Sequence, residues 1–218
     1  MRLSPYRVAL GSACLLLAAA FAGCGQPASA PAPAAAPAAP VESQIDRGHR
    51  LIIGGGCHDC HTPKKIGPNG PEANMDRMLS GHPQSEGVPA PFKPIKGSPY
   101  VIHINGHLTA WSGDWGVSFA ANLTPDMNTG LGIWTEDMFL AALKQGKHMG
   151  KSRPILPPMP WNWYGQLPED DLKAMFAYLR SIPAISNHVP MPLTPDGKPI
   201  ANRVPVPLTP DGKPIEQP

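Results

Sequence analysis

The stretch from residue 62 to residue 123 constrains the fold most, because it is rich in glycine and proline and has no sustained apolar periodicity. Proline lacks a backbone donor, and interior glycine destabilises regular elements, so long helices or strands are not expected there. Irregular segments of that length are uncommon inside compact domains. Since only 6% of the chain is aromatic, we expect something other than side chains to organise part of the core.

Three segments outside that stretch have the apolar spacing and end signals of helices. They are residues 41–55, 135–148 and 168–183. In the first, Ser43 and Asp46 form a capping box. In the second, Thr135 is the expected N-cap and acidic residues occupy the first turn. The third begins with a proline followed by three acids, which also favours a helix start.

Residues 57–61 read Cys-His-Asp-Cys-His, with two thiols two residues apart and an imidazole directly after the second. This Cys-x-x-Cys-His pattern is the attachment signature of c-type haem. Each thiol adds to one vinyl group of the porphyrin, and the histidine lies beneath the iron as proximal ligand. We therefore expect one haem c, bound covalently through Cys57 and Cys60 and ligated by His61. The apolar porphyrin would fill the core.

Two other uses of a cysteine pair remain to be compared with haem attachment. A structural zinc site would need a second pair of Cys or His residues at comparable spacing, whereas the other histidines are scattered along the chain. A thioredoxin-like redox pair would need a βαβ context, which this sequence does not show. Both alternatives fit the sequence less well.

The first 23 residues predict export. Arg2 and Arg7 form a basic n-region, and the apolar run of residues 8–22 is too short to span a bilayer. The run ends in Phe-Ala-Gly-Cys, which resembles the lipobox of bacterial lipoproteins, with phenylalanine where leucine is usual. Residues 1–23 are therefore predicted to be a lipoprotein signal peptide, and Cys24 the lipidated first residue. An ordinary signal peptide with Cys24 unmodified is the alternative.

Pro-rich segments flank the central part of the chain. Residues 24–41 form a Pro/Ala tether, which cannot build a core and would hold a domain away from a membrane. In the tail, residues 187–218, the sequence VPMPLTPDGKPI (189–200) recurs as VPVPLTPDGKPI (204–215). Each copy carries a Thr-Pro-Asp-Gly turn signal. We expect the tail to be disordered or to lie extended on the domain surface, with partner binding as the alternative.

The region between these segments, residues 42–186, resembles a class I-type monohaem cytochrome c. The likeness rests on a helix before the signature, a C-terminal helix reading DLKAMFAYLRSIP, and a Met-Pro segment just upstream of that helix. Gly48 matches the small residue at which the first and last helices of that family cross. Tyr178 and Leu179 match the aromatic-aliphatic pair on the other side. The resemblance implies an all-α, cytochrome c-like haem domain with long irregular loops.

A narrower likeness covers two segments on the C-terminal side of the irregular stretch. NLTPDMNTGLGIWTEDMFLAALKQGKH, followed by PPMPWNWYGQLPEDDLKAMFAYLRSI, is similar to the haem domains in cytochrome c subunits of membrane-associated periplasmic dehydrogenases. Those subunits often carry several haems, whereas this chain has one signature. The resemblance therefore implies a single-domain relative without a dehydrogenase domain.

The sixth iron ligand distinguishes an electron carrier from a haem protein that binds small molecules or peroxide. Met159, in ILPPMPWNWY, lies on a proline-stiffened loop before the last helix, where the resembled family places its axial methionine. We expect Met159 to be that ligand. Met149 and a histidine, such as His148 or His82, are the alternatives.

Further side chains are candidates for contact with the haem. The resemblance implies that Asn122 and Thr124, in ANLTPD, lie in a loop near the propionates. Arg153 could either neutralise a propionate or lie solvated on the surface. Four tryptophans could line the pocket or simply pack in the core: Trp111, Trp115, Trp161 and Trp163.

These features predict an exported, lipid-anchored monohaem c-type cytochrome on the periplasmic side of a bacterial membrane. It would be an electron carrier between periplasmic or membrane-bound redox partners, and not an enzyme. One alternative is a haem subunit docked permanently on a separate dehydrogenase or oxidase. Another is a five-coordinate haem enzyme or sensor. Without the two signal-peptide arginines, basic and acidic side chains are equal in number, which argues against a nucleic-acid partner.

Overall fold

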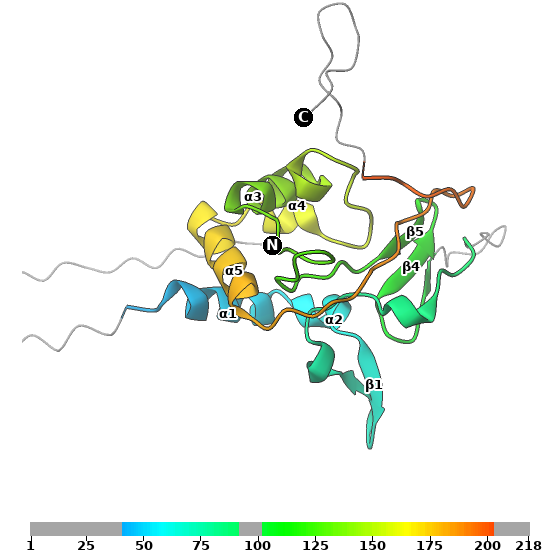
Figure 1. The fold of residues 1–218 in the computed structure, drawn as a ribbon, viewed down its shortest axis with the longest axis horizontal. Coiled ribbons are helices and arrows are strands. Elements are labelled where there is room, and N and C mark those ends of the chain that lie inside the picture. Colours follow the sequence, from blue (N-terminus) through cyan, green and yellow to red (C-terminus); the bar gives the residue numbers. More distant parts are fainter. Residues whose placement is uncertain (1–40, 92–101, 203–218) are drawn as a thin grey trace, which may run out of the picture. The chain divides into compact units, whose positions relative to one another are not determined.

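The computed structural model describes residues 41–91 and 102–202 of the 218-residue chain (Figure 1). The described helices are α1 (Gln44–Gly54), α2 (Cys57–His61), α3 (Glu136–Gln145), α4 (Trp161–Tyr164) and α5 (Glu169–Ser181). Short 3-10 helices are η1 (Met75–Arg77), η2 (Gln84–Glu86) and η3 (His148–Gly150). The predicted signal peptide, Cys24, almost all of the tether and the second tail copy lie outside the described residues.

The expected all-α class is wrong, because the described residues also form two antiparallel sheets. The strands are β1 (Lys64–Gly67), β2 (Gly70–Ala73), β3 (His103–Ile104), β4 (Ala110–Gly113) and β5 (Gly116–Phe119). Strands β1 and β2 form a hairpin that projects at the bottom of Figure 1, and β3, β4 and β5 pair in that order. All of these strands lie in the stretch that we expected to be irregular. Strands of two to four residues are too short for an alternating pattern to be read from sequence.

The three predicted helices are confirmed, together with the capping signals at two of them. Ser43 is the N-cap of α1, and its hydroxyl oxygen accepts the backbone N–H of Asp46 at 3.1 Å. Thr135 caps α3 in the same way, accepting the N–H of Met138 at 3.2 Å. Helix α5 follows Pro168 and carries three acids in its first turn. These ends agree with the sequence because each is specified by residues within one turn.

Helices α1 and α5 cross closely, and the core forms around their contact (Figure 1). Gly48 makes the approach possible, because a methyl group there would overlap the carbonyl of Ala174. Beside it, the ring of His49 stacks on Tyr178 with centroids 4.8 Å apart. The match of Gly48 to a close helix crossing is therefore confirmed.

Apolar side chains from α1, α3 and α5 pack together around the crossing. The most deeply buried include Ile52 of α1 and Leu172, Met175 and Leu179 of α5. Phe139 of α3 reaches Phe176 of α5 with ring centroids 5.2 Å apart, which is close enough for a favourable aromatic contact. Within residues 41–91 and 102–202, no helix combines the length and hydrophobicity that a bilayer crossing requires.

The crossing predicts a large difference between two glycines of the same helix. Gly48→Ala should lower the free energy of unfolding by about 1–3 kcal/mol, because the added methyl forces α1 away from α5. Gly54→Ala is the matched control, since a Cβ there meets nothing within 4 Å and alanine favours helix over glycine. Urea unfolding of both variants measures the difference, and equal midpoints would contradict the crossing.

Candidate functional site

The signature residues form one short helix, α2, directly after the end of α1. Gly56 precedes it with a φ of 65°, a left-handed conformation that glycine adopts readily. Helical spacing then brings Cys57, Cys60 and His61 to the same side, because residues three and four apart are neighbours on a helix. Cys57 and His61 are buried, Cys60 is half-buried, and neither cysteine is in a disulfide.

The ring of His61 is held in one orientation. Its Nδ1 lies 2.8 Å from the carbonyl oxygen of Ala121, and since a carbonyl only accepts, Nδ1 must donate. The proton is then on Nδ1, and the lone pair of Nε2 is available to a metal. Burial lowers the pKa of His61, which favours the neutral form that ligates metals. Both features fit a haem iron ligand.

The two thiols do not have the properties of a redox-active pair. Burial raises the pKa of Cys57 to about 11 and also raises the pKa of Cys60. Reactive cysteines of Cys-x-x-Cys motifs show the opposite shift, to low pKa values. Among the residues that the structure describes, no three Cys, His, Asp or Glu side chains come together to hold a metal ion. The thioredoxin-like and zinc alternatives are therefore not favoured by this geometry.

The loop that carries Met159 is attached to the β4–β5 hairpin. The hydroxyl of Ser118 donates to the carbonyl of Pro157 at 2.5 Å, and Nε1 of Trp115 donates to that hydroxyl at 3.1 Å. Met159 itself is half-buried and packs against the hydrophobic core, to which Cys57 also belongs. The two hydrogen bonds hold the backbone just before Met159 in place.

The segment after Met159 is attached to the turn before the signature. Helix α4 follows directly, and the hydroxyl of Tyr164 donates to the carbonyl of Gly55. Burial, together with the nearby cysteines, raises the pKa of Tyr164 to about 12, so this donor keeps its proton at any ordinary pH. Met159 thus lies on a segment that is fixed on both sides, by β5 and by the residues next to Cys57.

The alternative ligands lie in different surroundings. Met149 is half-buried in η3 and has a φ of 54°. This backbone conformation is uncommon for residues other than glycine. The ring of His148 meets Trp134 edge-on at 5.1 Å, and burial lowers its pKa to about 4. Both ring nitrogens of His82 lie near protein oxygens, on Thr109 at 3.0 Å and Gly87 at 3.3 Å. His82 is therefore poorly suited to bind a metal.

Asn122 and Thr124 support the loop that contains Ala121. The amide nitrogen of Asn122 donates to the carbonyl of Ile185 at 2.8 Å, and its oxygen accepts the Thr124 hydroxyl at 2.7 Å. Ile185 in turn donates its N–H to the same hydroxyl at 3.1 Å. These bonds connect the loop to the segment after α5. Contact of either side chain with a haem stays a prediction.

Arg153 is half-buried rather than fully solvated, and its guanidinium donates one hydrogen bond, from Nη1 to the carbonyl of Pro154 at 3.3 Å. Burial lowers its pKa, and its Nε is buried without a hydrogen-bond partner in the described part of the chain, as is Nδ1 of the neighbouring His148. A buried charge without a counter-charge is unfavourable. The guanidinium therefore suits a carboxylate that the described residues do not supply, such as a haem propionate.

The four tryptophans differ widely in burial. Trp111 is buried at 7% exposure, whereas Trp163 is 68% exposed. Trp161 packs over Gly146, where any Cβ would overlap its ring. Trp115 makes the hydrogen bond to Ser118 described above. Of these four tryptophans, Trp111, Trp115 and Trp161 are thus placed to line an interior surface, and Trp163 is not.

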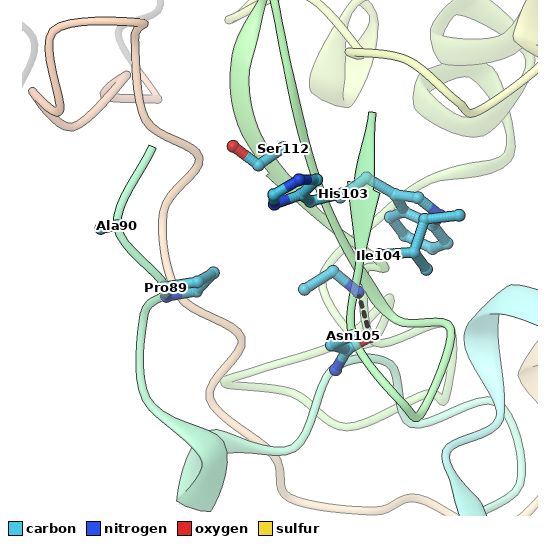
Figure 2. Close-up of a pocket in the computed structure, with 8 residues that line it drawn as sticks. Pro89, Ala90, His103, Ile104, Asn105 and Ser112 are labelled. Carbon is cyan, nitrogen blue, oxygen red and sulfur yellow. Dashed lines mark hydrogen bonds between the residues drawn. The ribbon is translucent and has the colours of Figure 1, made fainter. Parts of the chain in front are cut away.

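A separate cavity of about 160 Å³ lies between residues 89–90 and strands β3 and β4 (Figure 2). Its wall is formed by Pro89, Ala90, His103–Asn105 and Ala110–Ser112. Figure 2 shows the hydrogen bond that holds this wall, from the Ala110 N–H to the Asn105 side-chain oxygen at 3.0 Å. Ligand pockets are typically larger, from about 300 Å³ upward, and no signature residue reaches the cavity. It is not the candidate site.

Comparison with known proteins agrees with this geometry, although no family model matches the chain. It is 27% identical over 135 residues to the fructose dehydrogenase cytochrome subunit of Gluconobacter japonicus, covering 62% of this chain and 20% of that protein. It is 27% identical over 138 residues to the gluconate 2-dehydrogenase cytochrome c subunit of Pantoea cypripedii, covering 63% and 23%. A diheme cytochrome c-type protein of Cereibacter sphaeroides is 24% identical over 145 residues, covering 66% and 38%.

The chain therefore spans between a fifth and two fifths of the length of these relatives. They support a cytochrome c-like chain, and two of the three are named as subunits of dehydrogenases.

Proposed function

We propose that the chain carries one covalent haem c and transfers single electrons between periplasmic or membrane-bound redox partners. The observation that carries the proposal is helix α2, where two free cysteines and a buried histidine share one turn. The bond from His61 to Ala121 leaves one ring nitrogen available to iron. The relatives, which are cytochromes by name, support the same function.

Different residues of the site would hold different parts of the haem. Cys57 and Cys60 would form the two thioether bonds, His61 and Met159 would ligate the iron, and Arg153 would pair with a propionate. When bound, haem supplies one-electron chemistry at its iron. The chain contributes burial, orientation and a thioether ligand that stabilises the reduced state.

The anchored loop of Met159 favours a carrier over an enzyme. The hydrogen bond from Ser118 and the bond from Tyr164 to Gly55 fix the backbone on either side of the methionine. A ligand held in this way would remain bound in both oxidation states, so little rearrangement accompanies electron transfer. It would also keep peroxide and other small molecules from the iron, which disfavours the five-coordinate alternative.

A second candidate is a haem subunit docked permanently on a separate dehydrogenase. The names of two relatives favour it, since each is the cytochrome subunit of such an enzyme. The chain itself would still transfer electrons, but its partner would be fixed. Co-purification of a dehydrogenase at equal stoichiometry distinguishes this candidate from a freely exchanging carrier.

We also propose that Cys24 anchors the domain to the periplasmic face of a bacterial membrane, through lipids attached after removal of residues 1–23. This proposal rests on the sequence pattern that ends at Cys24 and on the Pro/Ala segment behind it.

Haem attachment is tested by removing both thiols. The Cys57→Ala/Cys60→Ala variant should lose all haem stain on a denaturing gel, because no covalent bond remains. The wild-type band should stain. Cys14→Ala is the matched control, since residue 14 belongs to the predicted signal peptide, and it should stain like the wild type. Wild-type protein that carries zinc and no haem would contradict the proposal.

The sixth ligand is tested by comparing two methionines. Met159→Ala should lose the weak long-wavelength absorption band of methionine-ligated ferric haem and bind carbon monoxide readily. Its reduction potential should fall, because methionine ligation raises the potential. Met127→Ala is the control, since that side chain is 60% exposed.

If Met149→Ala gives those changes and Met159→Ala does not, the ligand assignment moves to Met149. A wild-type protein that already binds carbon monoxide readily would instead favour the enzyme or sensor alternative.

The lipid anchor is tested by Cys24→Ser. Diacylation together with N-acylation gives stable membrane attachment, whereas a single chain binds marginally. The variant should therefore appear in the soluble periplasmic fraction or remain unprocessed, while the wild type sediments with membranes. Equal partition of the two proteins would argue for an ordinary signal peptide.

A further inference from the structure

The tail is docked on the domain through a buried asparagine that lies two residues before the first copy of the repeat. Asn187 is 0% exposed. Its amide nitrogen donates to the carbonyls of Ser80 and His82 at 2.7 and 2.8 Å. Its oxygen accepts from the Arg77 guanidinium at 2.8 Å and from the Gln84 N–H at 3.1 Å. Every hydrogen-bonding position of this side chain is thus satisfied by the domain.

Six residues later, the first copy adds to the edge of β5. Val117 and Leu193 exchange both backbone hydrogen bonds at 2.9 Å. Gly116 allows this approach, because a Cβ there would overlap the Leu193 carbonyl. The chain then turns, with Thr194 donating its N–H to the Lys198 carbonyl at 2.8 Å. We call the surface that receives Asn187 and Leu193 the tail seat.

The second copy contains every residue that the tail seat uses. At an offset of 15 residues, Asn202 corresponds to Asn187 and Leu208 to Leu193, and the Thr-Pro-Asp-Gly-Lys turn is repeated in full. The match also extends upstream of the Pro-rich part, since Ile185 corresponds to Ile200. The buried anchor is therefore part of the repeat.

The positions that differ between the copies are those whose side chains the seat does not use. Ser186 and His188, which become alanine and arginine in the second copy, are both exposed. His188 contributes its backbone N–H, which donates to the Gln84 side chain at 2.9 Å. Met191, replaced by valine, is 48% exposed. The differences therefore remove no contact that holds the first copy.

We propose that the tail seat accepts either copy of the repeat. The first copy occupies it in the ground state, and residues 202–215 of the same chain take its place when the first copy is released. Exchange leaves Ser186 where it is and loops out 15 residues between Ser186 and Asn202. Closing a loop of that length is disfavoured by roughly 60-fold, so the first copy occupies the seat in nearly all molecules.

Occupancy of the seat bears on the candidate site through strand β5. Leu193 pairs with Val117, and the next residue, Ser118, holds the carbonyl of Pro157 in front of Met159. A seated tail therefore fixes the strand that positions the expected iron ligand. This consequence rests on the proposed function, whereas the exchange of copies does not.

Amide hydrogen exchange at Val117 tests the exchange, because this N–H is protected by the carbonyl of residue 193. One variant, Asn187→Ala/Leu193→Pro, disables the first copy. Proline removes the N–H of residue 193, which donates to the carbonyl of Val117. A second variant, Asn202→Ala/Leu208→Pro, disables the second copy. A third combines all four changes, and truncation after Ser186 gives the unprotected reference.

The second-copy variant should protect Val117 like the wild type. The first-copy variant should retain protection, reduced by no more than about 60-fold, which is the loop-closure factor. The combined variant should fall to the level of the truncated chain. If the first-copy variant already falls to that level, the second copy does not enter the seat and the proposal is wrong.

A deletion provides an independent test that needs no loop. Removing residues 187–201 joins Ser186 directly to Asn202, so the second copy follows α5 in the register of the first. Val117 should be protected as in the wild type, and loss of protection would overturn the proposal. Concentration-dependent dimers of the first-copy variant would also overturn it, because the seat would then be filled from another molecule.

These exchange measurements do not depend on which group the cysteines hold. If the haem test fails but the predicted protection pattern is seen, the exchange of copies in the tail seat stands. Only its consequence for Met159 is then withdrawn.

Discussion

The hydrogen bond from His61 to the carbonyl of Ala121 connects the signature helix to the rest of the candidate site. Backbone hydrogen bonds also hold the residues around this ring. The N–H of Gly81 donates to the carbonyl of His61 at 2.8 Å, and the N–H of His82 donates to the carbonyl of Ala120 at 2.9 Å. A side chain at Gly81 would overlap the backbone of residues 120 and 121. Three segments far apart in sequence are therefore joined at the expected iron ligand, His61.

The parts of the structure that could be predicted from the sequence are those specified locally. Ser43 and Thr135 cap their helices with partners three residues away, and the signature requires only five consecutive residues. The two sheets could not be predicted, because their strands are short and their pairing depends on turns within a Gly- and Pro-rich stretch. The all-α class, which the resemblance implied, is therefore wrong, although each of the three predicted helices is present.

The supports of the site were also missed, because each joins residues that are distant in sequence. The prolines around Met159 indicated a stiff loop, but nothing nearby pointed to Ser118 or Tyr164 as its attachments. The propionate contact of Asn122 stays a prediction, and nothing in the sequence indicated that this side chain also hydrogen-bonds Ile185 after α5. For Arg153, which the sequence left open between a propionate contact and the surface, the buried Nε without a partner among the described residues favours the propionate contact.

The burial of Cys57 has a consequence for the order in which the protein matures. A thiol that is 9% exposed, with a pKa near 11, offers little thiolate and little access to an enzyme. If this thiol becomes a thioether, the bond must form before α4 and its Tyr164 close over the signature. Attachment would then belong to the newly made, still open chain, and closure of α4 and α5 would complete maturation.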